Sequence, residues 1–418
     1  MGLNARLGEV EESGSRPREN EPPPGKKSSA LKIGLITSHY PPDLTGASEF
    51  VAHAQARELI GRAHEVRVVT GCSWPHSGRD VLRGRIDDAD VSYLPRTIEE
   101  SASSEHGCAR WTRLALDELR GVDVYLVHAD DSLPLDLLPA LARRRPVVVC
   151  VNDLPANAGV CEQLGCADQV IVPSADLKRA LLELAPSLVG KLEVRQSGLC
   201  RVIPPMHVAQ RRAPWDGERP LSLFHFGRRT SASGLSLLIK SLRDLPSGRF
   251  ELVLAGGEGE AGLDDHLGSL AGELPLHFFG PYQTSQLAAL AAACDLAVFP
   301  SGTDRGLGLV IDEALALGLP VWCCEQADPL GRIRPSCDPA SEAGRGGLKR
   351  VESRPGRILA ADSPTDWSQA FEDLLEDPEQ LHTERHAVPR SFETTKDAVD
   401  RLESRLESLL SETFSKAS

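Results

Sequence analysis

The sequence lacks the dense runs of Lys and Arg on which sequence-independent nucleic-acid binding depends. Its 46 basic and 60 acidic residues give a formal net charge of -14 at pH 7, and its isoelectric point is about 5.4. Clustered positive charge is what holds a nucleic-acid backbone, and this composition argues against it. We expect no nucleic-acid partner.

Long apolar segments are also missing. No uninterrupted apolar run reaches the ~20 residues that a helix needs to cross a bilayer. Residues 1–30 are rich in Glu, Arg, Ser and Pro and contain no apolar core of a signal peptide. We expect an unstructured tail over residues 1–30, a cytoplasmic protein, and at most peripheral membrane contact.

Sequence patterns of metal and hydrolase sites are absent as well. No paired Cys or His spacing of the zinc type occurs, and no Asp-x-Asp stands where it suits a nucleotide-bound divalent ion. A Gly-x-Ser-x-Gly elbow and a Walker loop are missing too. The 10 cysteines are scattered except for the adjacent Cys323 and Cys324, a pair that ordinary disulfide geometry disfavours. We expect reduced thiols, no metal ion and no bound cofactor.

What is present is the length and composition of a two-domain globular protein. A chain of 418 residues is too long for one ordinary hydrophobic core, and 41% of its residues are hydrophobic. Two domains with a cleft between them are therefore expected, and a cleft suits a small-molecule ligand.

The first half alternates short apolar runs with amphipathic segments. Helical spacing of apolar residues covers residues 47–62 and 135–143, whereas strand-like runs cover 31–37, 65–70, 122–128, 146–151, 169–172 and 192–194. Apolar strands that alternate with helices indicate a parallel sheet covered on both faces. We predict a Rossmann-like domain over residues 31–200.

A segment with the Pro, Arg, Asp and Gly content of a linker covers residues 201–220, and the alternation then restarts. Strands are predicted at 221–226, 250–255, 276–279, 296–299 and 320–323, and helices at 235–244, 285–292 and 309–317. A second doubly wound domain over residues 221–365 follows from this pattern. Residues 366–418 are polar and periodic, and we expect helices that pack back toward the first domain.

The loop from Gly227 to Gly234 is the first candidate ligand site. It leaves a strand and enters a helix, and it carries Arg228 and Arg229 beside a glycine that permits close backbone approach. Arginine holds a diphosphate through charge-assisted bonds. The alternative is a simple turn at Gly227 with two solvated arginines, because short glycine motifs have many false positives.

The loop over residues 301–309 precedes a predicted helix that carries Asp312 and Glu313. Small residues here allow a nucleotide to lie against the backbone, and Glu313 is placed to hold ribose hydroxyls. The alternative is a capped helix with Glu313 on its solvent face. The apolar residues directly after Glu313 are also compatible with a buried position for its side chain.

Polar residues also follow several strands of the first domain. Gly46 lies in the loop after the first strand, His128 ends another, and Asn152 follows a third. In a Rossmann-like sheet these ends face one cleft, where they suit donor phosphates or an acceptor. A single histidine is usually structural, so none of these residues decides the function alone.

From Leu31 to about Leu410 the sequence resembles the retaining glycosyltransferase family four, also called glycosyl transferases group one. The segments that carry the resemblance are Tyr40-Pro41-Pro42 with Thr45-Gly46-Ala47, His64-Glu65-Val66, Ala167 to Ser174, Lys191 to Leu199, Phe226-Gly227-Arg228, Ala255-Gly256-Gly257, Phe279-Gly280, Cys294-Asp295, Gly306-Leu307-Gly308-Leu309, Glu313-Ala314 and Gly318-Leu319-Pro320. Each fragment is common, whereas their order and spacing are specific.

The resemblance implies a GT-B fold, with two Rossmann-like domains that face a central cleft. It implies a nucleoside-diphosphate sugar as donor, a sugar, lipid-linked or small-molecule acceptor, and transfer with retention of configuration and without metal. By family position, Arg228 stabilises the leaving diphosphate and Glu313 holds the ribose. Together with Asn152 and His128, these two are the predicted catalytic residues. The other residues predicted for the donor site are Gly46, Gly227, Arg229, Ser233, Gly280, Tyr282, Arg305, Gly306, Leu307, Gly308 and Leu309.

Departures from the family pattern fall on the same implied site. Ser233 stands where the family has a phosphate-binding lysine, and Arg229 is a candidate replacement. Arg305 stands where the first of two glutamates contacts the donor sugar. Asn152 replaces a histidine, and an amide binds a sugar hydroxyl but exchanges no proton near neutral pH.

Two functions of different classes are therefore compatible with the sequence. The first is a working glycosyltransferase, which Arg228, Glu313 and the glycine loops favour. The second is a catalytically silent GT-B protein that binds a nucleotide, a sugar or a partner protein, which Ser233, Arg305 and Asn152 favour. Fold alone does not separate them. A GT-B epimerase has no specific support.

Overall fold

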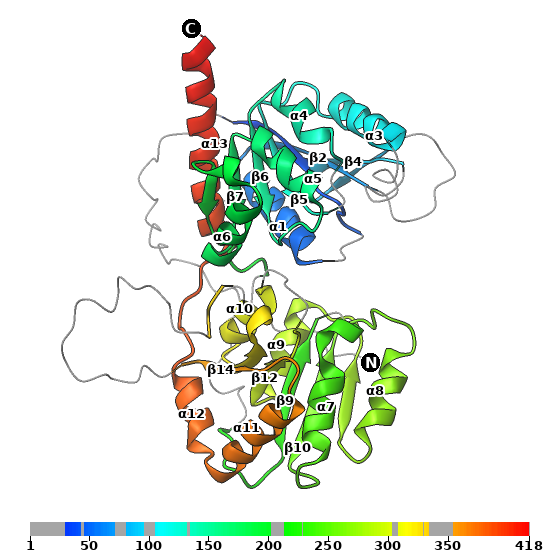
Figure 1. The fold of residues 1–418 in the computed structure, drawn as a ribbon, viewed down its shortest axis with the longest axis vertical. Helices are drawn as coiled ribbons and strands as arrows, with labels where there is room; N and C mark the ends of the chain where they lie inside the picture. The colour runs from blue at the N-terminus through cyan, green and yellow to red at the C-terminus, as the bar shows by residue number, and fades with distance from the viewer. Residues whose placement is uncertain are drawn as a thin grey trace, which may run out of the picture. The chain divides into compact units, whose positions relative to one another are not determined.

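The computed structural model describes residues 30–42, 46–71, 81–95, 105–131, 134–201, 213–227, 229–302, 308–328, 330–333 and 354–417 (Figure 1). Its strands form two separate sheets, one from each half of the chain. Helices alternate with the strands along most of each half.

The first half forms an eight-stranded sheet in the order β3-β4-β2-β1-β5-β6-β7-β8. Neighbouring strands are parallel except β3 and β4, which pair antiparallel. In the central strands, Ile33 of β1 lies between Val66 of β2 and Val124 of β5. The strands are β1 (Lys32–Ile36), β2 (Glu65–Thr70), β3 (Leu82–Ile86), β4 (Ala89–Tyr93), β5 (Val124–Ala129), β6 (Val147–Val151), β7 (Gln169–Val172) and β8 (Leu192–Val194).

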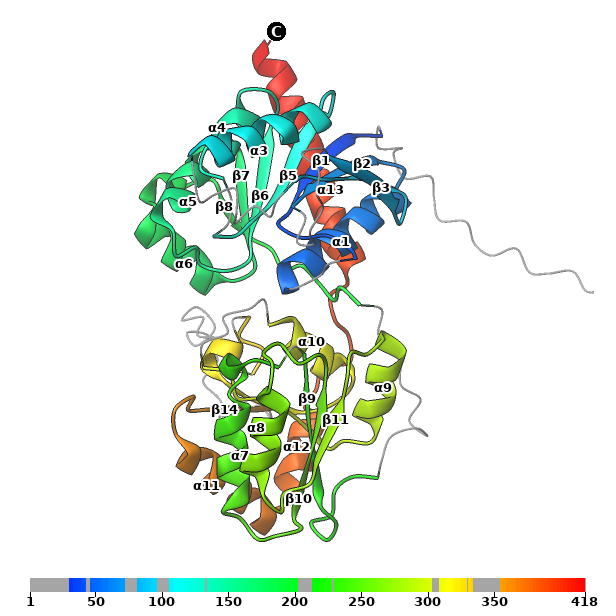
Figure 2. The ribbon, with the colours of Figure 1, turned by 90° about the vertical axis from the view of Figure 1, so that its right-hand side faces the viewer.

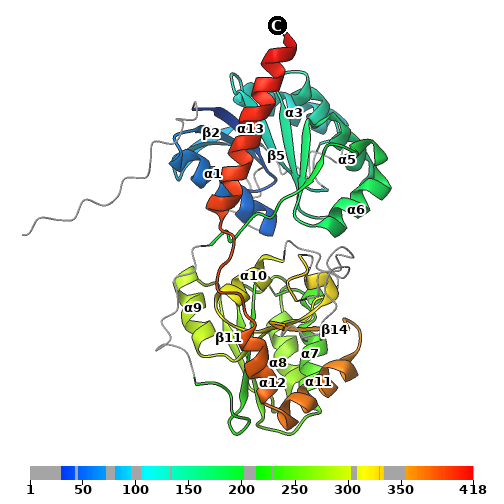
Figure 3. The same ribbon diagram turned by 90° about the vertical axis from the view of Figure 1, so that its left-hand side faces the viewer.

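Helices cover both faces of this sheet, which is why strands such as β6 are apolar throughout and fully buried. One face packs on α3 (Glu105–Glu118), α4 (Leu137–Ala142), α5 (Ala158–Gln163) and α6 (Ala175–Leu184). The other face packs on α1 (Ala47–Gly61) and α13 (Thr395–Ala417). Leu406 of α13 and Leu59 of α1 belong to one apolar cluster, and the two helices lie side by side (Figures 1 and 3).

The second half forms a six-stranded, fully parallel sheet in the order β11-β10-β9-β12-β13-β14. Its strands are β9 (Leu221–Phe226), β10 (Phe250–Ala255), β11 (Leu276–Phe279), β12 (Leu296–Phe299), β13 (Val321–Cys324) and β14 (Gly356–Leu359). Its helices are α7 (Leu235–Arg243), α8 (Leu263–Ala271), α9 (Thr284–Ala292), α10 (Leu309–Ala316), α11 (Pro364–Glu376) and α12 (Glu379–His386).

These helices again divide between two faces. One apolar cluster contains side chains of α7, α8, α11 and α12, and α7 and α8 lie side by side over it (Figures 1 and 2). The other cluster contains side chains of α9 and α10. Because side chains alternate along β13, Cys323 joins the α9–α10 cluster and Cys324 joins the opposite one. The adjacent thiols therefore point apart, and neither belongs to a disulfide.

The predicted pair of doubly wound sheets is confirmed, and four strands of the second sheet have the predicted bounds. The sequence pattern missed β3, β4 and α3, because residues 71–121 were interpreted as loop-rich. The reason is clear for β3, whose residues are mostly exposed at the sheet edge and lack apolar alternation. β14, α6 and α8 were also not predicted.

Candidate functional site

The loops after β9 and β10 touch through backbone atoms. Gly227 has a φ of 120° and Gly256 a φ of 130°, and a Cβ on Gly256 would lie 1.9 Å from the carbonyl oxygen of Gly227. The Arg229 N–H donates to the Gly257 carbonyl at 3.0 Å. Both loops leave the carboxyl ends of adjacent parallel strands, where doubly wound sheets bind ligands.

The side chain of Arg229 is committed to the fold. Its Nε and Nη2 donate to the two oxygens of Asp264 at 2.8 and 2.5 Å, and Nη1 donates to the Gly256 carbonyl at 2.7 Å. Only 3% of this side chain is exposed. Because Asp264 balances its charge, the expected substitution of Arg229 for a phosphate-binding lysine finds no support in these contacts and stays a prediction.

Ser233 stabilises the same loop locally. Its Oγ accepts a hydrogen bond from the Thr230 N–H at 3.0 Å, and its own N–H donates to the Thr230 carbonyl at 3.0 Å. The two residues form a capping box around the short helix Ser231–Ser233. Gly234 follows in a left-handed conformation, where a Cβ would lie 2.1 Å from the Pro300 carbonyl oxygen.

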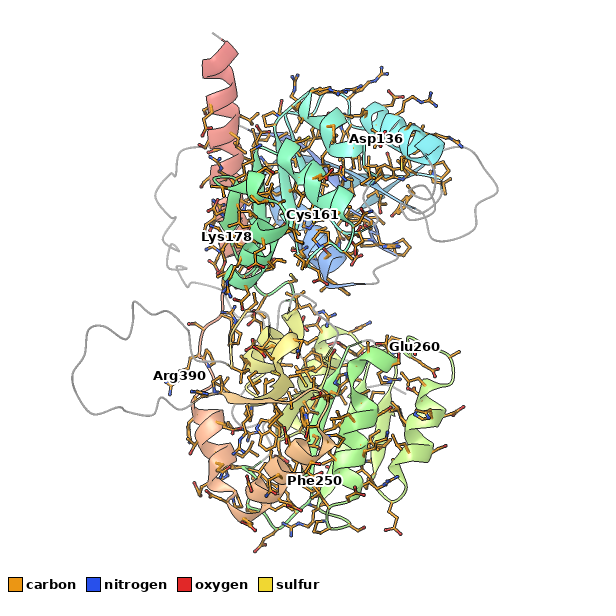
Figure 4. All side chains as sticks on the ribbon, viewed as in Figure 1. Asp136, Cys161, Lys178, Phe250, Glu260 and Arg390 are labelled. Carbon is orange, nitrogen blue, oxygen red and sulfur yellow. The ribbon has the colours of Figure 1, made fainter. Side chains whose placement is uncertain are left out.

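An internal carboxylate contacts the donors of this loop. The N–H and the hydroxyl of Ser231 donate to Oε1 of Glu260 at 2.8 and 2.9 Å. Glu260 lies in the loop that leads to α8 (Figure 4). The loop thus presents hydrogen-bond donors to an anion, as phosphate-binding loops before helices do.

Glu313 lies on α10 and is buried, with 4% of the residue exposed. Gly308 precedes the helix with a φ of 64°, and Leu309 is its first residue. Burial raises the pKa of Glu313 to about 7, although Arg201 acts to lower it, and Asp312 adds to the increase. Among the described residues, none donates a hydrogen bond to this carboxylate.

Arg201 is the cation beside Glu313. Its Nε lies 3.4 Å from Oε1 of Glu313, and its Nη1 donates to the hydroxyl of Tyr282 at 3.2 Å. The guanidinium carbon also lies 4.8 Å from the ring centre of Phe50 and 5.5 Å from that of Tyr282. Aromatic rings attract a guanidinium at these distances.

The neighbouring carboxylate, Asp312, has a cation of its own. Nε and Nη2 of Arg332 donate to its two oxygens at 2.6 and 3.0 Å, and Nη2 also donates to Gln196 at 2.7 Å. Asp328 fixes this arginine by accepting from the N–H groups of Arg332 and Ile333 at 2.8 and 2.9 Å. The charge of Asp312 is therefore balanced within the fold.

The loop after β1 brings polar groups to the start of α1. Gly46 is the N-cap residue of the helix, and a Cβ there would lie 2.7 Å from Oε2 of Glu49. Oε1 of Glu49 lies 3.5 Å from Nδ1 of His39. Burial acts to raise the pKa of Glu49, but hydrogen bonds from His39 and from backbone N–H groups outweigh it and lower the pKa.

His128 and Asn152 each contact a residue of α1. Nε2 of His128 lies 3.1 Å from Oε1 of Gln55, and Asn152 donates to the hydroxyl of Ser48. Gln55 and Asn152 line one cavity of about 20 Å³, enough for a single water molecule. Burial lowers the pKa of His128 to about 4. The imidazole is therefore neutral at pH 7 and suits hydrogen bonding better than proton transfer.

Solved structures share the fold of this chain over most of its length. Sucrose-phosphate synthase from Thermosynechococcus elongatus has a TM-score of 0.65 at 17% identity, covering 92% of this chain and 100% of that one. The catalytic domain of starch synthase IV from Arabidopsis thaliana, bound to ADP and acarbose, has a TM-score of 0.63 at 13% identity, covering 93% and 100%. HepE from Anabaena, in complex with UDP and glucose, has a TM-score of 0.54 at 16% identity, covering 92% and 100%. The fold is GT-B.

A family model matches one part of this GT-B chain. The model of the family described as glycosyl transferases group 1 matches residues 209–327. That range contains β9 to β13 and includes Gly227 and Glu313. Among curated proteins, none matches the chain.

The predicted donor residues of the GT-B chain fall into two groups. Arg228, Arg305, Gly306 and Leu307 lie outside the described residues. Gly280 follows β11, where its carbonyl accepts from the Gly256 N–H at 3.1 Å, and Tyr282 joins Arg201 beside Glu313. The structure thus brings Gly227, Gly256 and Gly280 together, and Glu313 with Tyr282.

Sequence analysis missed three charged residues of this region in the GT-B fold: Arg201, Asp264 and Arg332. Arg201 lies in the segment interpreted as linker, where nothing in the pattern marked it. The glycine loop marked Arg229 and the family pattern supplied Glu313, but neither marked their partners. Contacts between residues far apart in the sequence leave no periodic signal in a single chain.

Two further findings concern the described part of the GT-B chain only. None of its helices is long and apolar enough to cross a membrane. No group of three or more His, Cys, Asp and Glu side chains in that part is arranged to hold a metal ion.

Proposed function

We propose that this GT-B protein is a glycosyltransferase that moves a sugar from a nucleoside-diphosphate sugar to an acceptor hydroxyl, with retention of configuration and without a metal ion. The observation that carries the proposal is the family match over residues 209–327, which spans the loops after β9, β10, β11 and β12. Those loops leave the carboxyl ends of adjacent parallel strands. Two proteins of the same fold bind ADP, or UDP and glucose.

The donor nucleotide belongs to the second sheet in this proposal. Glu313 accepts hydrogen bonds from the ribose hydroxyls, and the glycine pair Gly227 and Gly256 lets the diphosphate approach the backbone. Arg228 stabilises the charge that develops on the leaving diphosphate. Catalysis then rests on electrostatic stabilisation of the leaving group and on alignment of the acceptor.

The acceptor belongs to the first sheet in this proposal. Asn152 lies in the loop after β6, where a sugar, lipid-linked or small-molecule hydroxyl can be recognised, whereas Gly46, in the loop after β1, closes over the donor diphosphate in this proposal. His128 supports this region through Gln55. Because His128 is neutral near pH 7 and Asn152 does not titrate, we assign them binding and alignment of the acceptor rather than proton transfer.

One observation favours the alternative, a GT-B protein that binds a nucleotide or sugar without transfer. In the loop from Gly227 to Gly234, the charge of Arg229 is balanced by Asp264, and the side chain of Ser233 caps a short helix. A phosphate would then depend on Arg228 and on backbone donors for its stabilisation. The loss of phosphate-binding cations would weaken nucleotide binding less than it would slow sugar transfer.

A binding screen followed by a turnover assay separates these functions. We expect a thermal shift with at least one of the UDP-, GDP- and ADP-sugars, and release of the nucleoside diphosphate when an acceptor is added. EDTA treatment should leave the rate unchanged, and NMR of the product should show the anomeric configuration of the donor. Binding without turnover on a broad acceptor panel would reject the enzyme. Absence of binding to every nucleotide would reject the enzyme and the nucleotide-binding form of the alternative.

A variant tests the assigned role of Arg228. We expect Arg228→Ala to weaken binding of the nucleoside diphosphate by about tenfold or more, because a charge-assisted hydrogen bond to phosphate is lost. Binding of the free nucleoside should change little. Equal losses for the two ligands would show that Arg228 does not contact the diphosphate.

A further inference from the structure

We propose that Arg201 is a positioning residue of the nucleotide site, which keeps the Glu313 carboxylate ionised and oriented to accept both ribose hydroxyls. This inference rests on the proposed function, because it requires the ribose of a nucleotide at Glu313. It assigns a role to a residue between β8 and β9, outside the loops that the sequence pattern selected.

The side chain of Arg201 is held mainly by contacts with residues other than Glu313. Tyr282 accepts a hydrogen bond from Nη1, and the rings of Phe50 and Tyr282 flank the guanidinium. Towards Glu313 there is a single approach, from Nε to Oε1 at 3.4 Å. Most of the side chain is buried, with 22% exposed. The guanidinium is therefore fixed chiefly by aromatic groups.

Two other arginine–carboxylate pairs in the same half of the chain use both carboxylate oxygens. Arg229 with Asp264 and Arg332 with Asp312 are bidentate, with both oxygens of each carboxylate occupied. Such a fork leaves a carboxylate little capacity for a ligand. The carboxylate of Glu313, in contrast, has a balancing charge nearby and accepts no hydrogen bond from the residues that the structure describes.

Several titratable groups face Glu313 from different elements. Asp312 lies beside it on α10, Cys200 and Arg201 follow β8, and Tyr282 follows β11. Burial and Asp312 raise the pKa of Glu313, and Arg201 is the group that lowers it, leaving it at about 7. Removal of Arg201 would therefore raise the pKa of Glu313, and its carboxyl group would stay protonated up to a higher pH.

The protonation state of Glu313 determines which hydrogen bonds its side chain makes with a ribose. An ionised carboxylate accepts hydrogen bonds from both hydroxyls of the diol, whereas the protonated acid keeps one O–H donor and loses acceptor capacity. Hydrogen bonds to a charged acceptor are also stronger. Nucleotide affinity should therefore rise as pH increases through the pKa of Glu313, and removal of Arg201 should move that rise to higher pH.

The experiment measures nucleotide and nucleoside affinity by calorimetry on both sides of neutral pH. The proteins are the wild type, Arg201→Met, Arg201→Lys and Glu313→Gln, with Arg243→Met as the control that removes an exposed charge at the end of α7. The ligands are UDP, GDP and ADP and their nucleosides. Circular dichroism and the unfolding midpoint verify that each variant is folded.

We expect Arg201→Met to move the pH midpoint of affinity upward by about one unit, equivalent to a tenfold loss below the midpoint. Arg201→Lys and Arg243→Met should keep the midpoint of the wild type, and Glu313→Gln should lose this pH dependence. The shift should persist with the nucleoside, because the ribose and not the phosphate meets Glu313.

Two results overturn the assignment of Arg201 while leaving the proposed function in place. One is a loss of affinity in Arg201→Met that is equal at every pH, which indicates a purely structural role. The other is a shift seen only with the diphosphate, which indicates direct contact with phosphate. If the wild type binds no nucleotide at any pH, the proposed function itself fails.

Discussion

At the scale of residues, the arginine–carboxylate pairs near the predicted nucleotide site are of two kinds. Arg229 and Arg332 each grip a carboxylate with two hydrogen bonds, and these pairs hold loops in place. Glu313 has a single approach from Arg201 and a raised pKa of about 7. A buried carboxylate held in this way is typical of functional sites rather than of structural pairs.

We expect Arg229→Met to lower the free energy of unfolding by about 3 kcal/mol, because Asp264 then lacks its partner beside a partly buried loop. Chemical denaturation measures this change. The matched control is Asp265→Asn on the same helix, at an exposed position. A change in Arg229→Met no greater than that of the control would show that the pair does not stabilise the fold.

At the scale of elements, the sequence predicted what periodicity can encode. The apolar runs of β9, β10 and β12 gave their bounds, because strands buried on both faces contain few polar residues. The edge strand β11 is largely exposed and was predicted from its Leu-His-Phe-Phe sequence. The edge strand β3 escaped prediction, since its Leu-Arg-Gly-Arg-Ile sequence is mostly exposed. Folding brings distant segments together, and for that reason neither Asp264 as the partner of Arg229 nor Arg201 as the partner of Glu313 could be predicted.

In the candidate site, too, motif residues were predicted from the sequence, whereas contacts between distant residues were not. The glycine loops and Glu313 came from motif and family resemblance, and the structure places Gly227 and Gly256 in backbone contact and buries Glu313. The use of Ser233 for capping could not be inferred, because a serine in that position is compatible with either a turn or a ligand site. Arg228 and Arg305 stay predictions.

A pair of glycine variants tests the contact between the loops after β9 and β10. Gly256→Ala should lower the free energy of unfolding by several kcal/mol, because its Cβ would lie 1.9 Å from the Gly227 carbonyl oxygen at a φ of 130°. Gly227→Ala should cost about 1 to 2 kcal/mol, since its Cβ meets nothing closer than 3.9 Å and only the backbone conformation is strained. Equal costs by chemical denaturation would contradict the close approach.

At the scale of the whole molecule, the C-terminal helix completes a face of the first sheet. Val399, Leu402, Leu406 and Leu409 of α13 belong to the same apolar cluster as side chains of α1, β1 and β5. The chain therefore builds part of its first core from its last helix. Stability of the first sheet should depend on residues that are far away in the sequence.

Substitution of a buried leucine in α13 tests this dependence. We expect Leu406→Ala to lower the free energy of unfolding by about 3 kcal/mol, because a fully buried side chain leaves a cavity. Ser404→Ala, at an exposed position of the same helix, should change it by less than about 0.5 kcal/mol. Similar values for the two variants would show that α13 contributes little to the core.

The central claim is that the second sheet binds a nucleoside-diphosphate sugar through Glu313 and that the protein transfers the sugar. The most direct measurement is release of nucleoside diphosphate from UDP-, GDP- and ADP-sugars in the presence of an acceptor panel, with Glu313→Ala as the comparison. The account expects release with at least one donor, dependence on an acceptor, and a loss of about tenfold or more in the variant. Absence of release and of binding for every donor, or equal rates in the two proteins, would contradict it.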